Sequence, residues 1–151
     1  MADTDTPTTD ATVHRQLAVD LFNHVWTLMG KPDRTREQDT EMIHAAHASR
    51  HHWGEVGTPV NVARGEWQVS RVYTVVGLHE AALHHARRCL DVCEKDGLGD
   101  WDLAYAYEAM ARAYGTAGAA PEAEAYKKLP SEVPIAADDD REHLEADLTT
   151  L

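Results

Sequence analysis

The chain has 151 residues, which suggests a single domain, and 43% of them are hydrophobic, enough to bury a core. Its net charge is -12 with the ten histidines counted as neutral. Nucleic acids and anionic membranes are bound through clustered Lys and Arg, so this charge argues against both as partners. No stretch approaches the roughly eighteen apolar residues of a membrane span, and the start of the chain lacks the features of a secretory signal. The sequence therefore favours the cytoplasm, where the two cysteines stay reduced.

The first half of the chain is expected to hold a polar tail and two helices. Residues 1–12 are small, polar and acidic and are predicted to be disordered. Apolar residues at three- and four-residue steps predict a first helix that begins at residue 13 and ends at Gly30. These residues are Leu17, Leu21, Val25 and Leu28. A second helix is expected over about 35–54, and two glycines and a proline then predict a break over 54–59.

The second half is also expected to be helical. Apolar spacing and breaks predict four more helices, over about 60–76, 80–94, 101–116 and 121–129. Asp100 is a suitable N-cap for the third of these, and Pro121 fits the first turn of the last. The acidic segment 130–151 is predicted to form a short helix that docks through its leucines. No segment shows strand alternation, so an all-α fold of six or seven helices is predicted.

Two stretches of the helical region match each other at an offset of 41 residues. The matching positions are Ser70, Tyr73, Gly77 and Ala82 in one stretch, and Ala111, Tyr114, Gly118 and Ala123 in the other. The small residue lets two helices approach closely, the tyrosine fills the hairpin, the glycine permits a left-handed turn, and the alanine lies at the crossing. This pattern, over about 60–129, resembles a long-repeat variant of the tetratricopeptide repeat (TPR) family, whose usual period is about 34 residues.

The resemblance implies a TPR-like stack of antiparallel helical hairpins, forming one domain over residues 13–129. It also implies a protein- or peptide-binding module without catalytic activity, because stacked hairpins present a groove. Seven residues are expected to line it: Arg64, Glu66, Trp67, Arg71, Tyr105, Glu108 and Arg112. Aromatic and Arg residues together are typical of binding hot spots, although the rings would serve equally in the core and the arginines in surface ion pairs. The open ends of a short stack also allow a homo-oligomer.

A second hypothesis is a metal-binding helical protein. Two sets of side chains have helical spacing: His44, His47 and His51 in the second helix, and His85, Cys89 and Cys93 in the fourth. Each set would present imidazole or thiolate ligands to Zn or Cu from one helical face. The competing interpretations are a polar stripe for the first set and buried core packing for the second. No other cofactor is predicted.

A third hypothesis is a small enzyme with its site at the bend formed by residues 52–66, which are rich in polar, rigid and aromatic side chains. Gly65 falls inside a helical pattern there and costs about 1 kcal/mol relative to Ala, which indicates a close helix contact or a bound group. No Ser-His-Asp order, glycine-rich phosphate loop or paired carboxylates stand out. The sequence therefore favours binding over catalysis.

Overall fold

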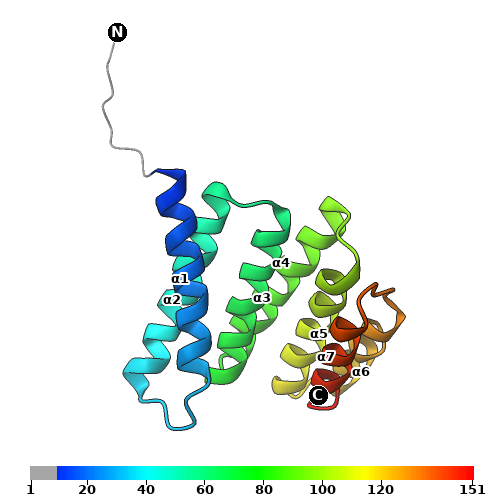
Figure 1. Cartoon of the computed structure of the whole chain (residues 1–151). Coiled ribbons are helices and arrows are strands. Elements are labelled where there is room, and N and C mark those ends of the chain that lie inside the picture. Colours follow the sequence, from blue (N-terminus) through cyan, green and yellow to red (C-terminus); the bar gives the residue numbers. More distant parts are fainter. Residues whose placement is uncertain (1–9) are drawn as a thin grey trace.

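A computed structural model describes residues 10–151, which form seven α-helices and one short 3₁₀ helix (Figure 1). In chain order these are α1 (Ala11–Met29), α2 (Arg36–Val56), α3 (Pro59–Val76), α4 (His79–Asp96), α5 (Asp100–Thr116), α6 (Ala120–Lys127), the 3₁₀ segment Pro130–Glu132 and α7 (Asp138–Leu148). This part of the chain contains no strand. The predicted all-α fold is therefore confirmed.

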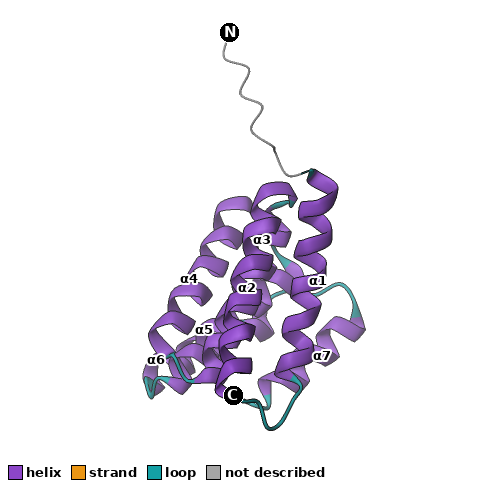
Figure 2. Ribbon diagram, turned by 90° about the vertical axis from the view of Figure 1, so that its left-hand side faces the viewer, coloured by secondary structure: helices purple, strands orange, loops and turns teal. Residues whose placement is uncertain are grey.

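Consecutive helices pair as hairpins that stack side by side. α1 packs on α2, α3 on α4, and α5 on α6, while α2 contacts α3 and α4 contacts α5 across the hairpins. α3 also contacts both α1 and α5, so the first helices of the hairpins share one layer. Figure 2 shows α1 and α7 at one side of the molecule and α4 and α6 at the other. The molecule is thus a two-layered stack of helical hairpins.

Small residues occupy two turns between helices and the contact between α3 and α4. Gly77 and Gly118 have positive φ angles of 81° and 78°. A residue with a Cβ would cost roughly 1–2 kcal/mol in that conformation. At the crossing of α3 and α4, the Ser70 hydroxyl donates a hydrogen bond to the Ala82 carbonyl at 2.8 Å. The left-handed turn predicted at Gly77 is therefore present, and Ser70 and Ala82 are in contact in this hairpin.

The buried side chains form clusters that meet at α3. One lies among α1, α2 and α3 and includes Met42 and Val72, and a second lies among α3, α4 and α5 and includes Met110. Tyr73 packs against both clusters. A third joins α5 to the C-terminal segment through residues such as Leu144. Helix α3 is thus the central element of the core.

Some helix ends differ from the predicted ones. α1 begins at Ala11, inside the tail predicted to be disordered, and residues 1–9 of that tail lie outside the described residues. The break predicted over 54–59 is wrong in extent, because α2 continues to Val56. The Asn61 side chain accepts a hydrogen bond from the Thr58 N–H at 3.0 Å, so α3 starts at once after a two-residue break.

Asp100 is not the N-cap of α5, as predicted, but the first residue of the helix, with a φ of 52°. One carboxylate oxygen accepts from the Trp101 N–H at 2.6 Å, and the other accepts from the Ala136 N–H at 3.1 Å. The side chain therefore ties the loop before α7 to the start of α5. Within residues 10–151, no helix combines the length and apolar character needed to cross a membrane.

Candidate functional site

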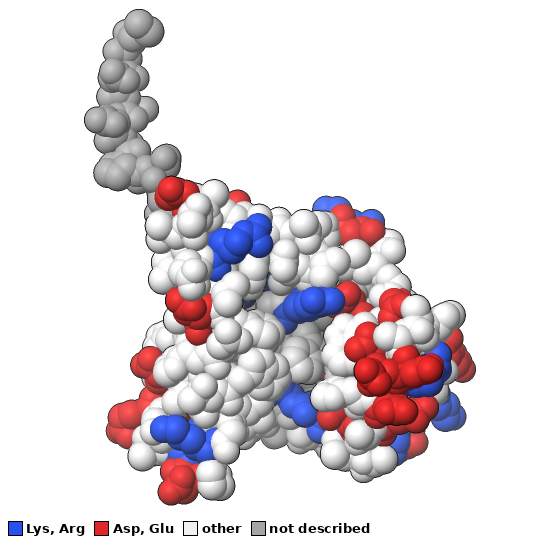
Figure 3. All heavy atoms as spheres, viewed as in Figure 1, with Lys and Arg blue, Asp and Glu red and all other residues white. Residues whose placement is uncertain are grey.

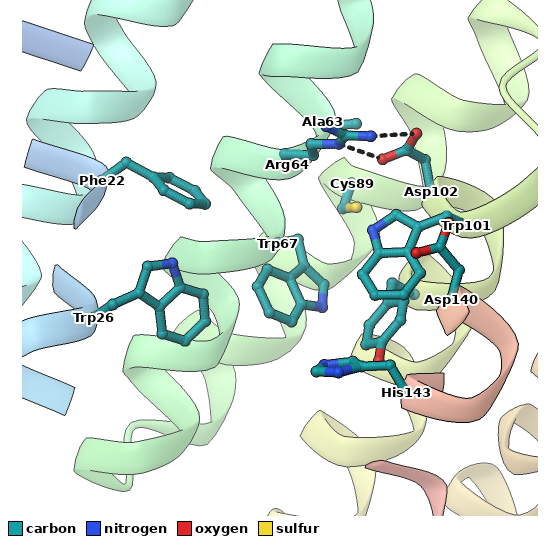
Figure 4. A pocket seen from close by; sticks show the side chains of 11 residues that line it. Phe22, Trp26, Ala63, Arg64, Trp67, Cys89, Trp101, Asp102, Asp140 and His143 are labelled. Atoms are coloured by element: carbon teal, nitrogen blue, oxygen red, sulfur yellow. Dashed lines mark hydrogen bonds and ion pairs between the residues drawn. The ribbon is translucent and has the colours of Figure 1, made fainter. Parts of the chain in front are cut away.

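A groove with a volume of about 640 Å³ opens between α1, α3, α5 and α7 (Figure 4). It is lined by Phe22, Trp26, Ala63, Arg64, Trp67, Cys89, Trp101, Asp102, Tyr105, Asp140 and His143. A smaller hollow of about 160 Å³ adjoins it, because Phe22 and Arg64 line both, and Trp53 lines this second hollow. All four tryptophans and the single phenylalanine of the chain therefore line these two spaces. We call the larger one, with its eleven residues, the aromatic groove.

The rings of the aromatic groove contact one another in series across three helices. Phe22 and Trp26 of α1 lie 6.0 Å apart between ring centroids, and Trp26 lies 5.6 Å from Trp67 of α3. Trp67 meets Tyr105 of α5 edge-on at 5.7 Å, and Tyr105 lies 4.3 Å from Trp101. Such tilted and edge-to-face contacts stabilise ring orientations. The rings therefore support one another along the groove.

Helical spacing explains why these rings turn to the same side. Phe22 and Trp26 are one turn apart on α1, so they share a face next to the buried Val25. Arg64 and Trp67 are likewise neighbours along α3. Trp26 keeps 37% of its surface exposed. The α1 face that borders the groove is therefore apolar yet open to solvent.

Polar groups flank the rings. The Arg64 guanidinium donates to both carboxylate oxygens of Asp102, with Nε–Oδ1 at 2.8 Å and Nη2–Oδ2 at 3.3 Å. This pair links α3 to α5, and hydrogen bonding to Asp102 raises the pKa of Arg64. Asp140 and His143 of α7 complete the lining. The Asp140 carboxylate accepts no hydrogen bond within residues 10–151, but its charge also helps to raise the pKa of Arg64.

Helix α7 is fixed to α5 as one wall of the groove. The Tyr105 hydroxyl donates to the Asp147 carboxylate at 2.6 Å. Burial and this hydrogen bond both raise the pKa of Tyr105, so the phenol stays protonated. Arg112 donates to the Thr150 hydroxyl at 2.7 Å, and Leu144 is buried against α5. The far end of α7 is thus held by polar contacts and its middle by apolar ones.

The seven residues expected to line a groove fall into three places. Arg64, Trp67 and Tyr105 line the aromatic groove. Arg71, Glu108 and Arg112 form a closed ion-pair cluster next to Trp67. Glu66 lies outside the groove and contacts α2 and α4 instead. The structure therefore brings together only three of the seven.

Glu108 is fully buried at the centre of its cluster. Its Oε1 accepts from Arg112 Nε at 2.6 Å and from Arg71 Nη1 at 3.3 Å, while Oε2 has no partner in the described part of the chain. A buried carboxylate is stable only when paired in this way. These three side chains therefore join α3 to α5 and line the same small space as Trp67.

Glu66 is the centre of a second buried cluster. Its Oε1 accepts from Arg50 Nε at 2.9 Å and from Arg88 Nε at 3.0 Å, and its Oε2 accepts from His85 Nδ1 at 2.7 Å. Burial alone would raise the pKa of Glu66, but the hydrogen bonds from His85 and Arg88 outweigh it and hold the pKa at about 2. Gly65 permits this arrangement, because a Cβ there would lie 3.1 Å from Arg50 Cδ. The glycine inside α3 thus marks a close helix contact.

The two predicted metal sets meet at His47 and His85, whose ring centroids lie 5.2 Å apart. His47 shares a hydrogen bond with the Tyr73 hydroxyl at 2.8 Å, and burial, then His85, lower its pKa. The hydrogen bond to Cys93 and burial both raise the pKa of the Cys89 thiol, so this sulfur is neutral. Among the described residues, no three His, Cys, Asp or Glu side chains are grouped as metal ligands. His44 and His51 lie on α2 with His47, and His85 already binds Glu66.

The residues 52–66, predicted to form one bend, are divided among separate contacts. His52 lies against His14 with their Nδ1 atoms 2.8 Å apart, Trp53 lines the smaller hollow, and Glu66 is buried in its ion-pair cluster. Burial, followed by repulsion from His14, lowers the pKa of His52. At least one of the two imidazoles is therefore neutral and accepts the shared hydrogen bond.

Several groove residues were not singled out from the sequence. Phe22 and Trp26 gave a usable signal, because they form a second apolar stripe beside the stripe that packs in the core. Trp101 also follows from the position of Tyr105, since residues four apart on a helix are neighbours. Asp140 and His143 gave no local signal, because α7 joins the groove only through tertiary packing.

Comparison of the chain with known protein families, with curated proteins and with solved structures gave no match.

Proposed function

We propose that this chain is a TPR-like binding module that holds a peptide segment of a partner protein in the aromatic groove and catalyses no reaction. One observation carries this proposal: all four tryptophans and the single phenylalanine line the groove and its adjoining hollow. A core alone does not require this, since Trp26 remains 37% exposed. Tryptophan and tyrosine are the residues most enriched at binding hot spots, and the volume falls within the range of ligand sites.

The polar groups of the groove suit a peptide. The Arg64–Asp102 pair offers fixed donors and acceptors beside the rings, as peptide main chains require. The Cys89 thiol is buried and has a raised pKa, so it contributes apolar surface rather than a nucleophile. The resemblance of residues 60–129 to TPR hairpins supports a binding site on the same face, because the first helices of such hairpins form the groove.

Selection from a random peptide library tests the proposal. Enriched peptides would be synthesised and their affinities measured by calorimetry against the wild type and Trp26→Ala. We expect the substitution to weaken binding by about tenfold or more, since it removes an exposed ring from the groove. Leu78→Ala is the control, because Leu78 is 52% exposed but does not line the groove.

Two results would contradict the proposal. One is a library that yields no peptide binding the wild type. The other is a set of peptides whose affinity is unchanged in both Trp26→Ala and Arg64→Ala. Circular dichroism would show that each variant keeps its helical content.

A further inference from the structure

We propose that the segment bound in the aromatic groove is cationic, with Arg or Lys side chains set among apolar residues. This inference rests on the proposed function and adds the chemistry of the partner. It comes from two independent features of the lining, the ring faces and the balance of charge, which both favour a cation over an anion.

The rings provide the first feature. Trp26, Trp67 and Trp101 all border the same open space, and Tyr105 lies between the last two. Aromatic faces carry negative potential and attract guanidinium and ammonium groups within about 6 Å, with tryptophan the strongest. The aliphatic part of an Arg or Lys side chain would pack against the same rings. The lining therefore matches the long side chains of Arg and Lys.

The charges provide the second feature. The lining holds two carboxylates, Asp102 and Asp140, and one arginine, Arg64. Asp102 uses both oxygens on Arg64, so this pair is neutral as a unit, while the Asp140 carboxylate accepts no hydrogen bond in the described chain and acts on Arg64 only through its charge. The charges of Arg64, Asp102 and Asp140 therefore sum to one net negative charge in the groove lining.

The surroundings strengthen this charge. Three more acids, Asp138, Asp139 and Glu142, lie in the first turns of α7 beside Asp140, and they outnumber the one cation among them, Arg141. Figure 3 shows acidic side chains gathered over α7, next to the hollow. The whole chain carries a net charge of -12. A negative potential at this wall attracts a cationic segment and speeds its arrival.

An anionic segment fits poorly. It could reach the remaining N–H donors of Arg64, but the charge of this guanidinium is already balanced by Asp102 through two hydrogen bonds. It would also approach Asp140, and like charges brought together cost free energy. The groove adjoins the hollow lined by Trp53, with Phe22 and Arg64 lining both, so the two spaces together suit a chain rather than a single small cation.

Matched peptides test this inference. In a series of labelled, terminally blocked peptides, leucine alternates with Arg, Lys, Gln or Glu, and binding is measured by fluorescence anisotropy. We expect the Arg and Lys peptides to bind about three- to thirtyfold more tightly than the Gln peptide. We expect the Glu peptide to bind most weakly. Added salt should reduce the difference.

Asp140→Asn is the informative variant, and Asp139→Asn is its matched control. Both remove one charge from the first turn of α7, but only Asp140 lines the groove. We expect Asp140→Asn to weaken binding of the Arg peptide several-fold and to leave binding of the Gln peptide unchanged. Asp139→Asn should weaken binding of the Arg peptide less. Equal losses in the two variants would overturn the assignment to the groove.

The outcomes separate this inference from the proposed function. If Gln or Glu peptides bind as tightly as Arg peptides, and Trp26→Ala weakens them all, the groove binds peptides but is not selective for cations. If arginine amide alone binds as tightly as the Arg peptide, the site takes small cations and the peptide assignment is overturned. If neither this series nor the library yields a binder, both proposals are wrong.

Discussion

A single buried carboxylate fixes the relative positions of three helices. Glu66 of α3 is 3% exposed and accepts hydrogen bonds from Arg50 of α2 and from His85 and Arg88 of α4. Burying this charge is costly, but its three partners offset the cost. Removal of the carboxylate would leave its cationic partners close together without a counter-charge. The network is therefore sensitive to one substitution at its centre.

We expect Glu66→Gln to lower the free energy of unfolding by about 2–4 kcal/mol, because the partners lose their counter-charge. Urea denaturation followed by circular dichroism would measure the change. Glu145→Gln is the control, since Glu145 is exposed and forms no ion pair within residues 10–151, and its effect should stay below about 0.5 kcal/mol. Equal stabilities of the two variants would contradict the central role of Glu66.

The same carboxylate predicts a pH dependence. Its pKa is about 2 in the folded protein and 4.5 for the free group, so it contributes stability that is fully present above pH 4.5. This contribution is lost as the pH falls from 4.5 towards 2, because the unfolded state then binds the proton more readily. The stability difference between wild type and Glu66→Gln should shrink over this range. A difference that stays constant from neutral pH to pH 3 would contradict the assigned pKa.

At the scale of elements, the groove depends on how α7 is docked. Leu144 is buried between α5 and the segment that precedes α7, while Tyr105 and Asp147 join the end of the helix to α5. The remaining surface of α7 is strongly acidic, and its first turn holds three aspartates. One leucine therefore supplies most of the deeply buried apolar contact that holds this wall in place.

We expect Leu144→Ala to detach α7 and to weaken peptide binding without unfolding the hairpins. Loss of this apolar contact costs about 2–5 kcal/mol and mainly lowers the free energy that holds α7 against the rest of the protein. Hydrogen exchange by mass spectrometry should show faster exchange over 138–148 and unchanged protection in α3. If exchange rises equally in α3 and α7, the helix is not a separate unit.

At the scale of the whole molecule, α3 joins the packed clusters into one structure. Met42 is buried in the cluster of α1, α2 and α3, and Met110 is buried in the cluster of α3, α4 and α5. Tyr73 contacts both. Because the two clusters share a helix, loss of packing in one cluster should destabilise the other. The hairpins should therefore unfold together.

We expect Met42→Ala and Met110→Ala each to destabilise the protein by about 2–5 kcal/mol and to shift one common thermal transition. Calorimetry and circular dichroism should give coincident midpoints for both variants. If Met42→Ala instead produces two separate transitions, the α1–α2 hairpin is an independent unit, and the role given to α3 is wrong.

The fold was more predictable than the groove for a physical reason. An amphipathic helix carries its pattern locally, so the helices of 13–129 could be located from apolar spacing, and Gly77 and Gly118 marked two turns. The end of α2 could not be located in this way, because α2 runs through Gly54 although glycine lowers helix stability. The groove joins side chains from five helices, and Asp140 reaches it only through the docking of α7. Contacts between distant helices are set by tertiary packing, and they produce no regular spacing of residue types in the sequence.

The placement of the tryptophans gives the molecule an optical property. All four indoles line one connected surface, so the intrinsic emission of the protein reports on that surface and not on its general folding alone. A peptide that enters the groove would exclude water from Trp26 and shift the emission to shorter wavelength, with no label attached. The negative charge of Asp140 would also repel iodide, so that a neutral quencher such as acrylamide reaches the three indoles of the aromatic groove more readily than an anionic one.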